Sequence, residues 1–337
     1  MTSKYEQELQ AALRAVRLAS RVCRLVQETI THEVLEKKDR SPVTVADFAS
    51  QAVICRALEA AVPDDPIVGE EDASELALPE NADFLTRIRN TLGQVDIPAD
   101  DGEICRWIDR GCASGKSDRF WTLDPIDGTK GFLRREQYAV SLALIVDGRI
   151  QVAVLGCPNL PVDPSRAEPA GVMFWAVRGA GSWMLPLAGD RSETRVHVSR
   201  TSDPKESRFC ESVESSHSSH DLSARVAGDL GITLEPMRLD SQAKYAVVAR
   251  GEADIYMRLP QKADYKEKIW DHAGGVLIIE EAGGKVTDLL GRPLEFDHGV
   301  TLSANRGVLA TNHVLHESVF SVLKNHYPPR VRHTASP

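Results

Sequence analysis

Acidic residues stand at the ends of the strands and at the start of a helix that the sequence predicts. Glu70 follows the short apolar strand PIVG, and Asp124 and Asp127 lie in DPIDGTKG, directly after the apolar run FWTL. Asp47 closes the extended segment SPVTVAD, and Asp271 stands in KIWDHAGG, where a helix is expected to begin. Strand ends and helix starts are where α/β proteins place their ligand sites. These carboxylates are therefore the first candidates for chemistry.

The segment DPIDGTKG carries the most specific signal. Its proline and first glycine predict a tight turn that directs the carboxylates of Asp124 and Asp127 to one place. Two carboxylates this close repel each other unless a divalent cation lies between them. Oxygen ligands alone favour Mg²⁺, Mn²⁺ or Ca²⁺ over zinc or copper. Thr129 offers a hydroxyl that can orient a water, and Lys130 suits a phosphate. An Asp-Pro turn is also common as a purely structural feature, but GEED before it and WDHAGG after it favour a metal site.

The elements that must position these carboxylates fall into two parts. An amphipathic helix is predicted over 12–30, and a second helix from about Phe48 to Ala61. Two β runs joined at Asp147-Gly148 predict a hairpin, and the proline-rich loop PNLPVDPSRAEPAG that follows is the expected domain boundary. We expect an N-terminal α+β subdomain over 1–160 that carries most of the metal ligands, and a C-terminal α/β subdomain over 161–337.

The C-terminal part alternates strands and helices. Helical stretches are expected over 221–230, 242–250 and 271–282, with short strands between them. The segment GGKVTDLLGRPLEF is predicted to form a last hairpin, and a strand and a helix follow over 308–325. The whole pattern indicates two layered halves of mixed α and β structure.

Composition narrows the class of protein. The 337 residues are 42% hydrophobic and 26% charged, which is ordinary for a globular chain and excludes a disordered or collagen-like one. Forty basic and forty-nine acidic residues give a net charge of −9, which argues against a partner such as a nucleic acid polymer or an anionic membrane. A small anionic ligand remains possible, because bound cations can reverse the field at one site.

The six cysteines are scattered and form no CxxC pair, which favours free thiols in a reducing compartment. No apolar run approaches the roughly 20 residues that span a bilayer, and MTSKYEQELQ lacks the apolar segment of a signal peptide. A cytoplasmic monomer is the expectation.

Four segments together resemble the metal-dependent, lithium-sensitive phosphatase superfamily that contains inositol monophosphatase: SPVTVADF, PIVGEED, WTLDPIDGTKGF and KIWDHAGGVLIIEEAGG. Within it, four more are similar to the 3'(2'),5'-bisphosphate nucleotidases of fungi and plants: FLRREQYAVSLALI, SHSSHD, LDSQAKYAVVARGEADIYMRLP and YKEKIWDH. The resemblance runs from about residue 5 to 325. It implies a layered α-β-α-β-α sandwich of the inositol monophosphatase (sugar phosphatase) type. It also implies Mg²⁺-dependent removal of the 3'-phosphate of adenosine 3',5'-bisphosphate, with activity on the phosphosulfate form.

The same resemblance assigns roles residue by residue. It implies that Glu70, Asp124 and the backbone carbonyl of Ile126 hold one Mg²⁺, and that Asp124, Asp127 and Asp271 hold a second. A third ion would be shared by Glu70 through water, with Glu71 further out. Asp47 and Thr129 would form the pair that takes a proton from the attacking water. Residues implied to contact the substrate are Thr129, His217, Ser241, Lys244, Arg258 and Asp271, with His220 as an alternative to His217.

Three other functions stay open. Inositol polyphosphate 1-phosphatase and inositol monophosphatase activities would use the same carboxylates, although the SQAKY segment and Arg258 favour a nucleotide. A catalytically silent nucleotide sensor on the same fold is the third. The complete metal set and the Asp47–Thr129 pair argue against a silent protein.

Overall fold

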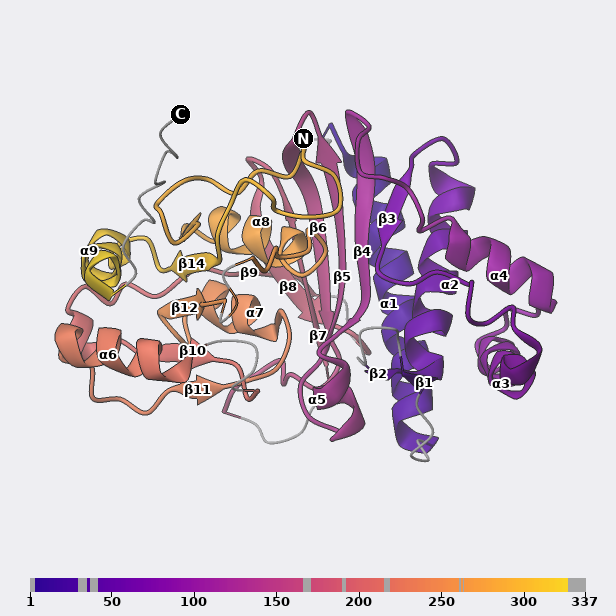
Figure 1. Cartoon of the computed structure of the whole chain (residues 1–337), viewed down its shortest axis with the longest axis horizontal. Helices are drawn as coiled ribbons and strands as arrows, with labels where there is room; N and C mark the ends of the chain where they lie inside the picture. Colours follow the sequence, from indigo (N-terminus) through magenta and orange to yellow (C-terminus); the bar gives the residue numbers. More distant parts are fainter. Residues whose placement is uncertain are drawn as a thin grey trace, which may run out of the picture.

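The structure is a computed structural model that describes residues 4–29, 35–36, 42–165, 171–189, 192–214, 219–260, 262 and 264–326. Five layers follow one another across the molecule (Figure 1). Helices α1 and α2 cover one face of a seven-stranded sheet, α7 and α8 lie between that sheet and a five-stranded one, and α6 and α9 cover the outer face of the second sheet. The expected α-β-α-β-α sandwich is confirmed.

The helices of the described residues have these bounds: α1 Glu6–Thr29, α2 Val45–Ala61, α3 Ala82–Gly93, α4 Asp101–Asp109, α5 Thr129–Leu133, α6 His220–Leu230, α7 Ala243–Ala249, α8 Ala273–Glu281 and α9 His316–His326. The strands of the first sheet, in spatial order, are β3 Ile67–Gly69, β4 Arg119–Asp127, β5 Ala139–Val146, β6 Arg149–Cys157, β7 Val172–Val177, β8 Gly181–Pro186 and β9 Thr194–Arg195. Those of the second, also in spatial order, are β11 Met237–Arg238, β10 Phe209–Glu211, β12 Ile255–Arg258, β14 Val308–Thr311 and β13 Lys285–Thr287. A two-stranded pair, β1 Leu35–Glu36 and β2 Pro42–Val43, stands apart.

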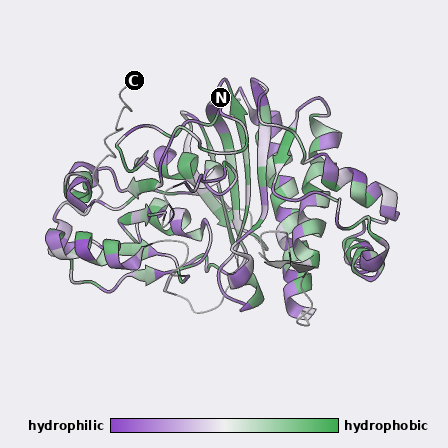
Figure 2. Ribbon diagram, viewed as in Figure 1, coloured by the Kyte–Doolittle hydropathy of each residue, from purple (hydrophilic) through white to green (hydrophobic). Residues whose placement is uncertain are grey.

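Apolar side chains fill three cores: one between α1, α2 and the first sheet, one that packs α7 and α8 against both sheets, and one between the second sheet and α6 and α9. The hydrophobic colouring is concentrated in the central strands, whereas the outer helices are hydrophilic on the side that faces away from the sheets (Figure 2). The amphipathic pattern expected over 12–30 corresponds to α1, whose apolar residues pack on β5 and β6. Burial of these faces is what holds the layers together.

The first sheet continues past residue 160. Strands β7, β8 and β9 follow the proline-rich loop and still pair, in order, with β6. The chain passes to the second sheet only between Arg195 and Phe209. The subdomain boundary expected at residue 160 therefore does not coincide with the change of sheet. The strands on either side of the proline-rich segment, β6 and β7, pair antiparallel, so this segment joins two strands of one sheet.

Helix α2 begins three residues before the expected start near Phe48. Thr44 is its N-cap, and Asp47 is the third residue of a capping box: the Oδ2 of Asp47 accepts from the backbone N–H of Thr44 at 2.8 Å and from its hydroxyl at 2.6 Å. Asp47 thus lies inside a helix rather than at the end of an extended segment, and the sequence signal T-x-x-D could have shown it. One turn further on, the hydroxyl of Ser50 donates to the carbonyl of Pro125 at 2.9 Å.

The DPID segment is a bulged strand end and not the turn that the sequence predicts. Asp124 lies opposite Ser141 of β5, and Asp127 lies opposite Ala139, so β4 has one residue more than β5 between the two pairs. Side chains alternate along a strand, and residues three apart would face opposite sides of a regular one. The extra residue brings both carboxylates to the same face, the one that α7 and α8 cover.

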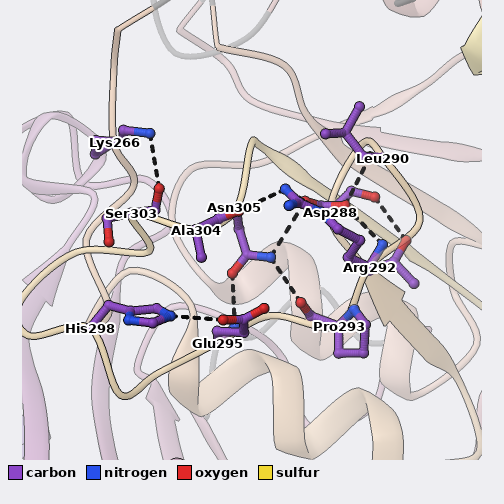
Figure 3. A network of polar contacts seen from close by, with 11 residues as sticks. Lys266, Asp288, Leu290, Arg292, Pro293, Glu295, His298, Ser303, Ala304 and Asn305 are labelled. Carbon is purple, nitrogen blue, oxygen red and sulfur yellow. Dashed lines mark hydrogen bonds and ion pairs between the residues drawn. The ribbon is translucent and has the colours of Figure 1, made fainter. Parts of the chain in front are cut away.

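The last hairpin is also different from the expectation. Strand β13 pairs with β14 rather than with the residues that follow it, and residues 288–307 form the loop between them. Asp288, fully buried, accepts from the backbone N–H groups of Leu290 and Arg292 and from the Arg292 guanidinium (Figure 3). Asn305 donates to the carbonyl of Pro293 at 2.8 Å. Side chains therefore satisfy the backbone polar groups that a hairpin ladder would have paired.

Candidate active site

A cavity of about 440 Å³ lies between the two sheets, at the bulged end of β4. Its walls come from β4, the start of α5, the segment before α7, strand β12 and the segment before α8. Nine residues expected to take part in the site line it: Glu70, Asp124, Ile126, Asp127, Thr129, Ser241, Lys244, Arg258 and Asp271. Asp47 lies behind Thr129, and His217 lies outside the described residues. The structure therefore gathers residues from five separate stretches of the chain.

Several of the residues that line this cavity are carboxylates. Burial raises the pKa of Asp271 well above its usual range, and the charges of Asp127 and Glu70 raise it further. Burial likewise raises the pKa of Asp127, although the Lys244 cation and the backbone N–H of Gln242, 2.6 Å from its Oδ2, act in the opposite direction. Crowded carboxylates of this kind are costly unless a cation neutralises them. Because every donor is an oxygen, the set fits a hard divalent ion.

Thr129 is the first residue of α5 and lies where that helix meets α2. Its Oγ1 is 3.5 Å from Oδ1 of Asp47 and 3.4 Å from the carbonyl of Ile126. Gly128, just before it, has φ of 86°, and a Cβ there would lie 3.0 Å from Cβ of Ser241. Only glycine combines this left-handed conformation with so close a neighbour. The glycine thus lets the Thr129 hydroxyl lie next to the Asp47 carboxylate.

Lys244 and Arg258 bring positive charge to the same cavity. Lys244 is buried, with its Nζ donating to the carbonyl of Leu239 at 3.2 Å and lying 5.5 Å from the ring of Tyr256. Burial lowers the pKa of Lys244, and the charge of Asp127 partly compensates. Arg258 comes from β12. Lys130 and Lys268 also line the cavity, as does Asp240. We call Glu70, Asp124, Asp127 and Asp271 its cation-binding side, and Lys244 and Arg258 its anion-binding side.

Gln242, which belongs to the SQAKY segment but was assigned no role from the sequence, joins the elements around this cavity. Its side-chain amide donates to the carbonyl of Trp270 at 2.9 Å and accepts from the backbone N–H of Gly275 at 3.0 Å. Together with its own N–H on Asp127, these bonds hold the start of α8 against the end of β4. Tyr256, Tyr265, Lys268 and Trp270 also line the cavity; they lie in segments that carry the family resemblance, but none of them was assigned a role from the sequence. No spacing rule marks them, because each is placed by the packing of the two sheets.

His220 and Glu71, which the family resemblance had suggested for the site, do not line the cavity. His220 begins α6, and its Nε2 is 3.0 Å from the carbonyl of Ser212, so this ring is engaged with the backbone. Glu71 is buried, and its backbone is held from both sides by the amide of Gln51. Neither is among the residues that line the cavity. The roles implied for His217 and for an outer Glu71 stay predictions.

Two further findings bear on the class of protein. None of the helices in the described part of the chain is long and apolar enough to cross a bilayer. All six cysteines lie within that part and are free, as the scattered spacing predicts. Burial raises the pKa of Cys157 and of Cys210 to about 12, so these thiols behave as core residues.

Comparison with known proteins agrees with the geometry. The family model described as "Inositol monophosphatase family" matches residues 4–327. The 3'(2'),5'-bisphosphate nucleotidase of Schizosaccharomyces pombe is 44% identical, with 94% of each chain covered. The enzyme of that name from Emericella nidulans is 43% identical, covering 95% of this chain and 98% of its own. The enzyme "3'(2'),5'-bisphosphate nucleotidase 1" of Arabidopsis thaliana is 43% identical, covering 83% of this chain and 84% of its own.

Solved structures show the same fold. The inositol monophosphatase of Thermotoga maritima superposes with a TM-score of 0.65 at 20% identity and covers 94% of this chain and 97% of its own. The inositol monophosphatase from Anabaena gives 0.60 at 22%, covering 96% of this chain and 97% of its own. This chain therefore belongs to the inositol monophosphatase family, a family of metal-dependent phosphatases, as a relative of the 3'(2'),5'-bisphosphate nucleotidases.

Proposed function

We propose that this protein is a Mg²⁺-dependent 3'(2'),5'-bisphosphate nucleotidase that removes the 3'-phosphate of adenosine 3',5'-bisphosphate to give AMP and phosphate, and that it acts on the phosphosulfate form as well. The observation that carries the proposal is the mixed lining of one cavity, which holds the carboxylates of Glu70, Asp124, Asp127 and Asp271 together with the cations of Lys244 and Arg258. A substrate with two phosphates matches this lining, because metal ions on the carboxylates would bind one phosphate and the cations the other. The curated relatives at 43–44% identity bear the corresponding name.

The carboxylate side is assigned to two or three Mg²⁺ ions. Their ligands would be Glu70, Asp124, Asp127 and Asp271 and the carbonyl of Ile126, an all-oxygen set of the kind that Mg²⁺ prefers. When bound, the ions supply neutralisation of the phosphate charge and acidification of the attacking water.

Thr129 and Asp47 move the proton in this proposal. The Thr129 hydroxyl donates toward Oδ1 of Asp47, which leaves its oxygen lone pairs able to accept from a water. The carboxylate makes the hydroxyl a competent relay, because a threonine alone is a weak base. The capping-box bonds from Thr44 hold the Asp47 carboxylate through Oδ2 and so orient Oδ1 toward the cavity.

The anion-binding side distinguishes this function from the hydrolysis of an inositol monophosphate. Lys244 and Arg258 would bind the 5'-phosphate, which an inositol monophosphate lacks. Ser241, whose hydroxyl bonds the backbone N–H of Ala243 at 3.1 Å, would contact the nucleotide between the two phosphates, together with His217.

The test is phosphate release from adenosine 3',5'-bisphosphate, its phosphosulfate form, inositol 1,4-bisphosphate and inositol 1-phosphate, each with Mg²⁺ and with excess EDTA. We expect Mg²⁺-dependent release with kcat/KM highest for the adenosine compounds. A higher kcat/KM for either inositol phosphate would assign the protein to inositol phosphate hydrolysis, and no release from any of the four would favour a silent nucleotide sensor.

We also propose a cytoplasmic monomer. Free cysteines, four of them buried, suit a reducing compartment. Size-exclusion chromatography with light scattering tests the oligomeric state, and fractionation of the source cells tests the compartment.

A further inference from the structure

Behind the anion-binding side of the cavity lies a chain of four polar side chains. The Nε of Arg258 is 3.3 Å from each carboxylate oxygen of Glu267, and Oε2 of Glu267 is 3.2 Å from Nε2 of His272. The Nδ1 of His272 is 2.7 Å from the hydroxyl of Tyr245. Glu267, His272 and Tyr245 are at most 3% exposed. Glu267 itself does not line the cavity, although the other three residues do.

The donors and acceptors of this chain fit in one arrangement. A carboxylate only accepts, so Nε2 of His272 must carry a hydrogen and donate to Glu267. In the neutral ring Nδ1 is then an acceptor, which the hydroxyl of Tyr245 satisfies. Glu267 therefore accepts from His272 on one side and from Arg258 on the other.

Glu267 is ionised in this position. Burial acts to raise its pKa, but the charge of Arg258 and the hydrogen bond from His272 lower it below the usual range. Burial acts to lower the pKa of Arg258, but the negative charge of Glu267 acts in the opposite direction, and the pKa of Arg258 is raised above its usual value. The guanidinium and the carboxylate thus stabilise each other's charge in a dry environment, where orientation matters most.

The fold holds Glu267 through its backbone. The N–H of Leu302 donates to the carbonyl of Glu267 at 2.9 Å, and the N–H of Ile269 donates to the carbonyl of Val300. Lys266 bonds the carbonyl of Ser303 at 3.0 Å, at the edge of the network around Asp288 (Figure 3). The loop 288–307 therefore holds residues 266–269, and with them Glu267, in place.

We propose that Glu267 is a positioning residue that sets the preference for substrates with a second phosphate. It holds Arg258 through Nε, and the Tyr265 hydroxyl is also hydrogen-bonded to the guanidinium, so the remaining N–H groups of the Nη atoms can bind a phosphate. An arginine fixed at Nε loses less rotational freedom when the anion arrives. The inference rests on the proposed function, because it assigns Arg258 to the remote phosphate.

The test compares Glu267→Gln with the wild type on adenosine 3',5'-bisphosphate and on adenosine 3'-monophosphate, which differ only in the 5'-phosphate. We expect KM for the bisphosphate to rise about 10-fold, the size of one charge-assisted hydrogen bond, with kcat within about 3-fold. Values for the monophosphate should stay within about 3-fold. The matched control is Glu295→Gln, which removes a similar Glu–His contact at the surface, 2.7 Å from His298, and should leave the ratio of the two kcat/KM values unchanged.

A second variant shows whether Glu267 acts through Arg258. Arg258→Gln should lower the bisphosphate preference, and adding Glu267→Gln to it should lower the preference no further. Equal losses on both substrates, an unchanged ratio, or additive effects in the double variant would each overturn the inference. A wild type that hydrolyses neither adenosine compound would instead overturn the proposed function, and this inference with it.

Discussion

The Oδ1 of Asp47 lies 3.5 Å from the hydroxyl oxygen of Thr129, although 82 positions separate the two residues in the chain. One belongs to the first turn of α2 and the other to the first residue of α5. Asp47 therefore serves two purposes: Oδ2 caps its own helix, and Oδ1 faces the hydroxyl that the proposed mechanism uses.

Asp47→Asn is expected to lower kcat by about 10²–10⁴-fold, the usual contribution of a general base. The amide would donate to Thr129 or accept from Thr44, but it could not take up a proton. Stability should fall by no more than about 1 kcal/mol, because an asparagine oxygen can still accept from the Thr44 N–H. Steady-state phosphate release and urea denaturation measure the two effects. Wild-type turnover in the variant would refute the assignment of the base.

Asp271→Asn is expected to abolish activity and, in excess EDTA, to raise the melting temperature. The reason is that Asp127 and Glu70 repel a charge on the Asp271 carboxylate in the metal-free cavity. The asparagine amide has nearly the same shape but no charge, so the repulsion is absent in the variant. Active-site groups that are needed for activity often lower the stability of the folded protein in this way. Thermal unfolding in EDTA checks it, and added Mg²⁺ should stabilise the wild type more than the variant. A lower melting temperature for the variant in EDTA would contradict the explanation.

Lys244→Met is expected to raise KM for adenosine 3',5'-bisphosphate about 10-fold or more while kcat/KM for inositol 1-phosphate changes little. Methionine fills similar space and removes a buried charge, so the fold should be retained. Lys285→Met, which removes a half-exposed lysine paired with Glu317, is the matched control. An unchanged KM together with a large drop in melting temperature would show that Lys244 is structural.

Acid is expected to destabilise the protein through His316. Burial lowers the pKa of this ring to about 4, and its two nitrogens lie 3.1 and 3.0 Å from the hydroxyls of Thr287 and Thr311. Because the unfolded chain binds the proton more readily, stability is fully present above about pH 6.5 and is lost as the pH falls toward 4. At pH 5 the loss is about 2 kcal/mol.

Urea denaturation at pH 7 and pH 5 measures this loss. His316→Gln should have a lower free energy of unfolding than the wild type at pH 7. Between pH 7 and pH 5, however, this free energy should fall by about 2 kcal/mol less in the variant than in the wild type. His197→Gln, at an exposed histidine, should keep the wild-type acid sensitivity. Identical acid sensitivity in His316→Gln and the wild type would exclude His316 as the cause.

Elements whose pattern is local could be predicted from the sequence, whereas the contacts between distant segments could not. Hydrophobic periodicity predicted α1, the β5–β6 hairpin and the strands of the central sheet, because alternation and helical spacing are properties of the local chain. The carboxylates, Thr129 and the two cations were named from residue type, motif and family resemblance. Their joint presence around one cavity follows from the fold.

Local signals failed where a neighbouring element decides the conformation. DPID reads as a turn, but pairing with β5 keeps it in the sheet and adds a bulge. The pattern of GGKVTDLLGRPLEF predicts a hairpin, but β13 pairs with β14 instead. In the loop that follows β13, the side chain of Asp288 accepts a hydrogen bond from the backbone N–H of Leu290. Strand pairing is a contact between distant segments, so a window of sequence cannot contain its partner.

The sequence by itself thus determined which groups carry charge, which segments must be buried and which chemistry the oxygen donors suit. Only the tertiary structure decided that a strand bulge, and not a turn, brings Asp124 and Asp127 to the same side, that Oδ1 of Asp47 lies 3.5 Å from Thr129, and that Glu267 holds Arg258. Residue types set the strength of an interaction, but these interactions act over a few ångströms, and only the packing of the two sheets brings such distant residues within that range.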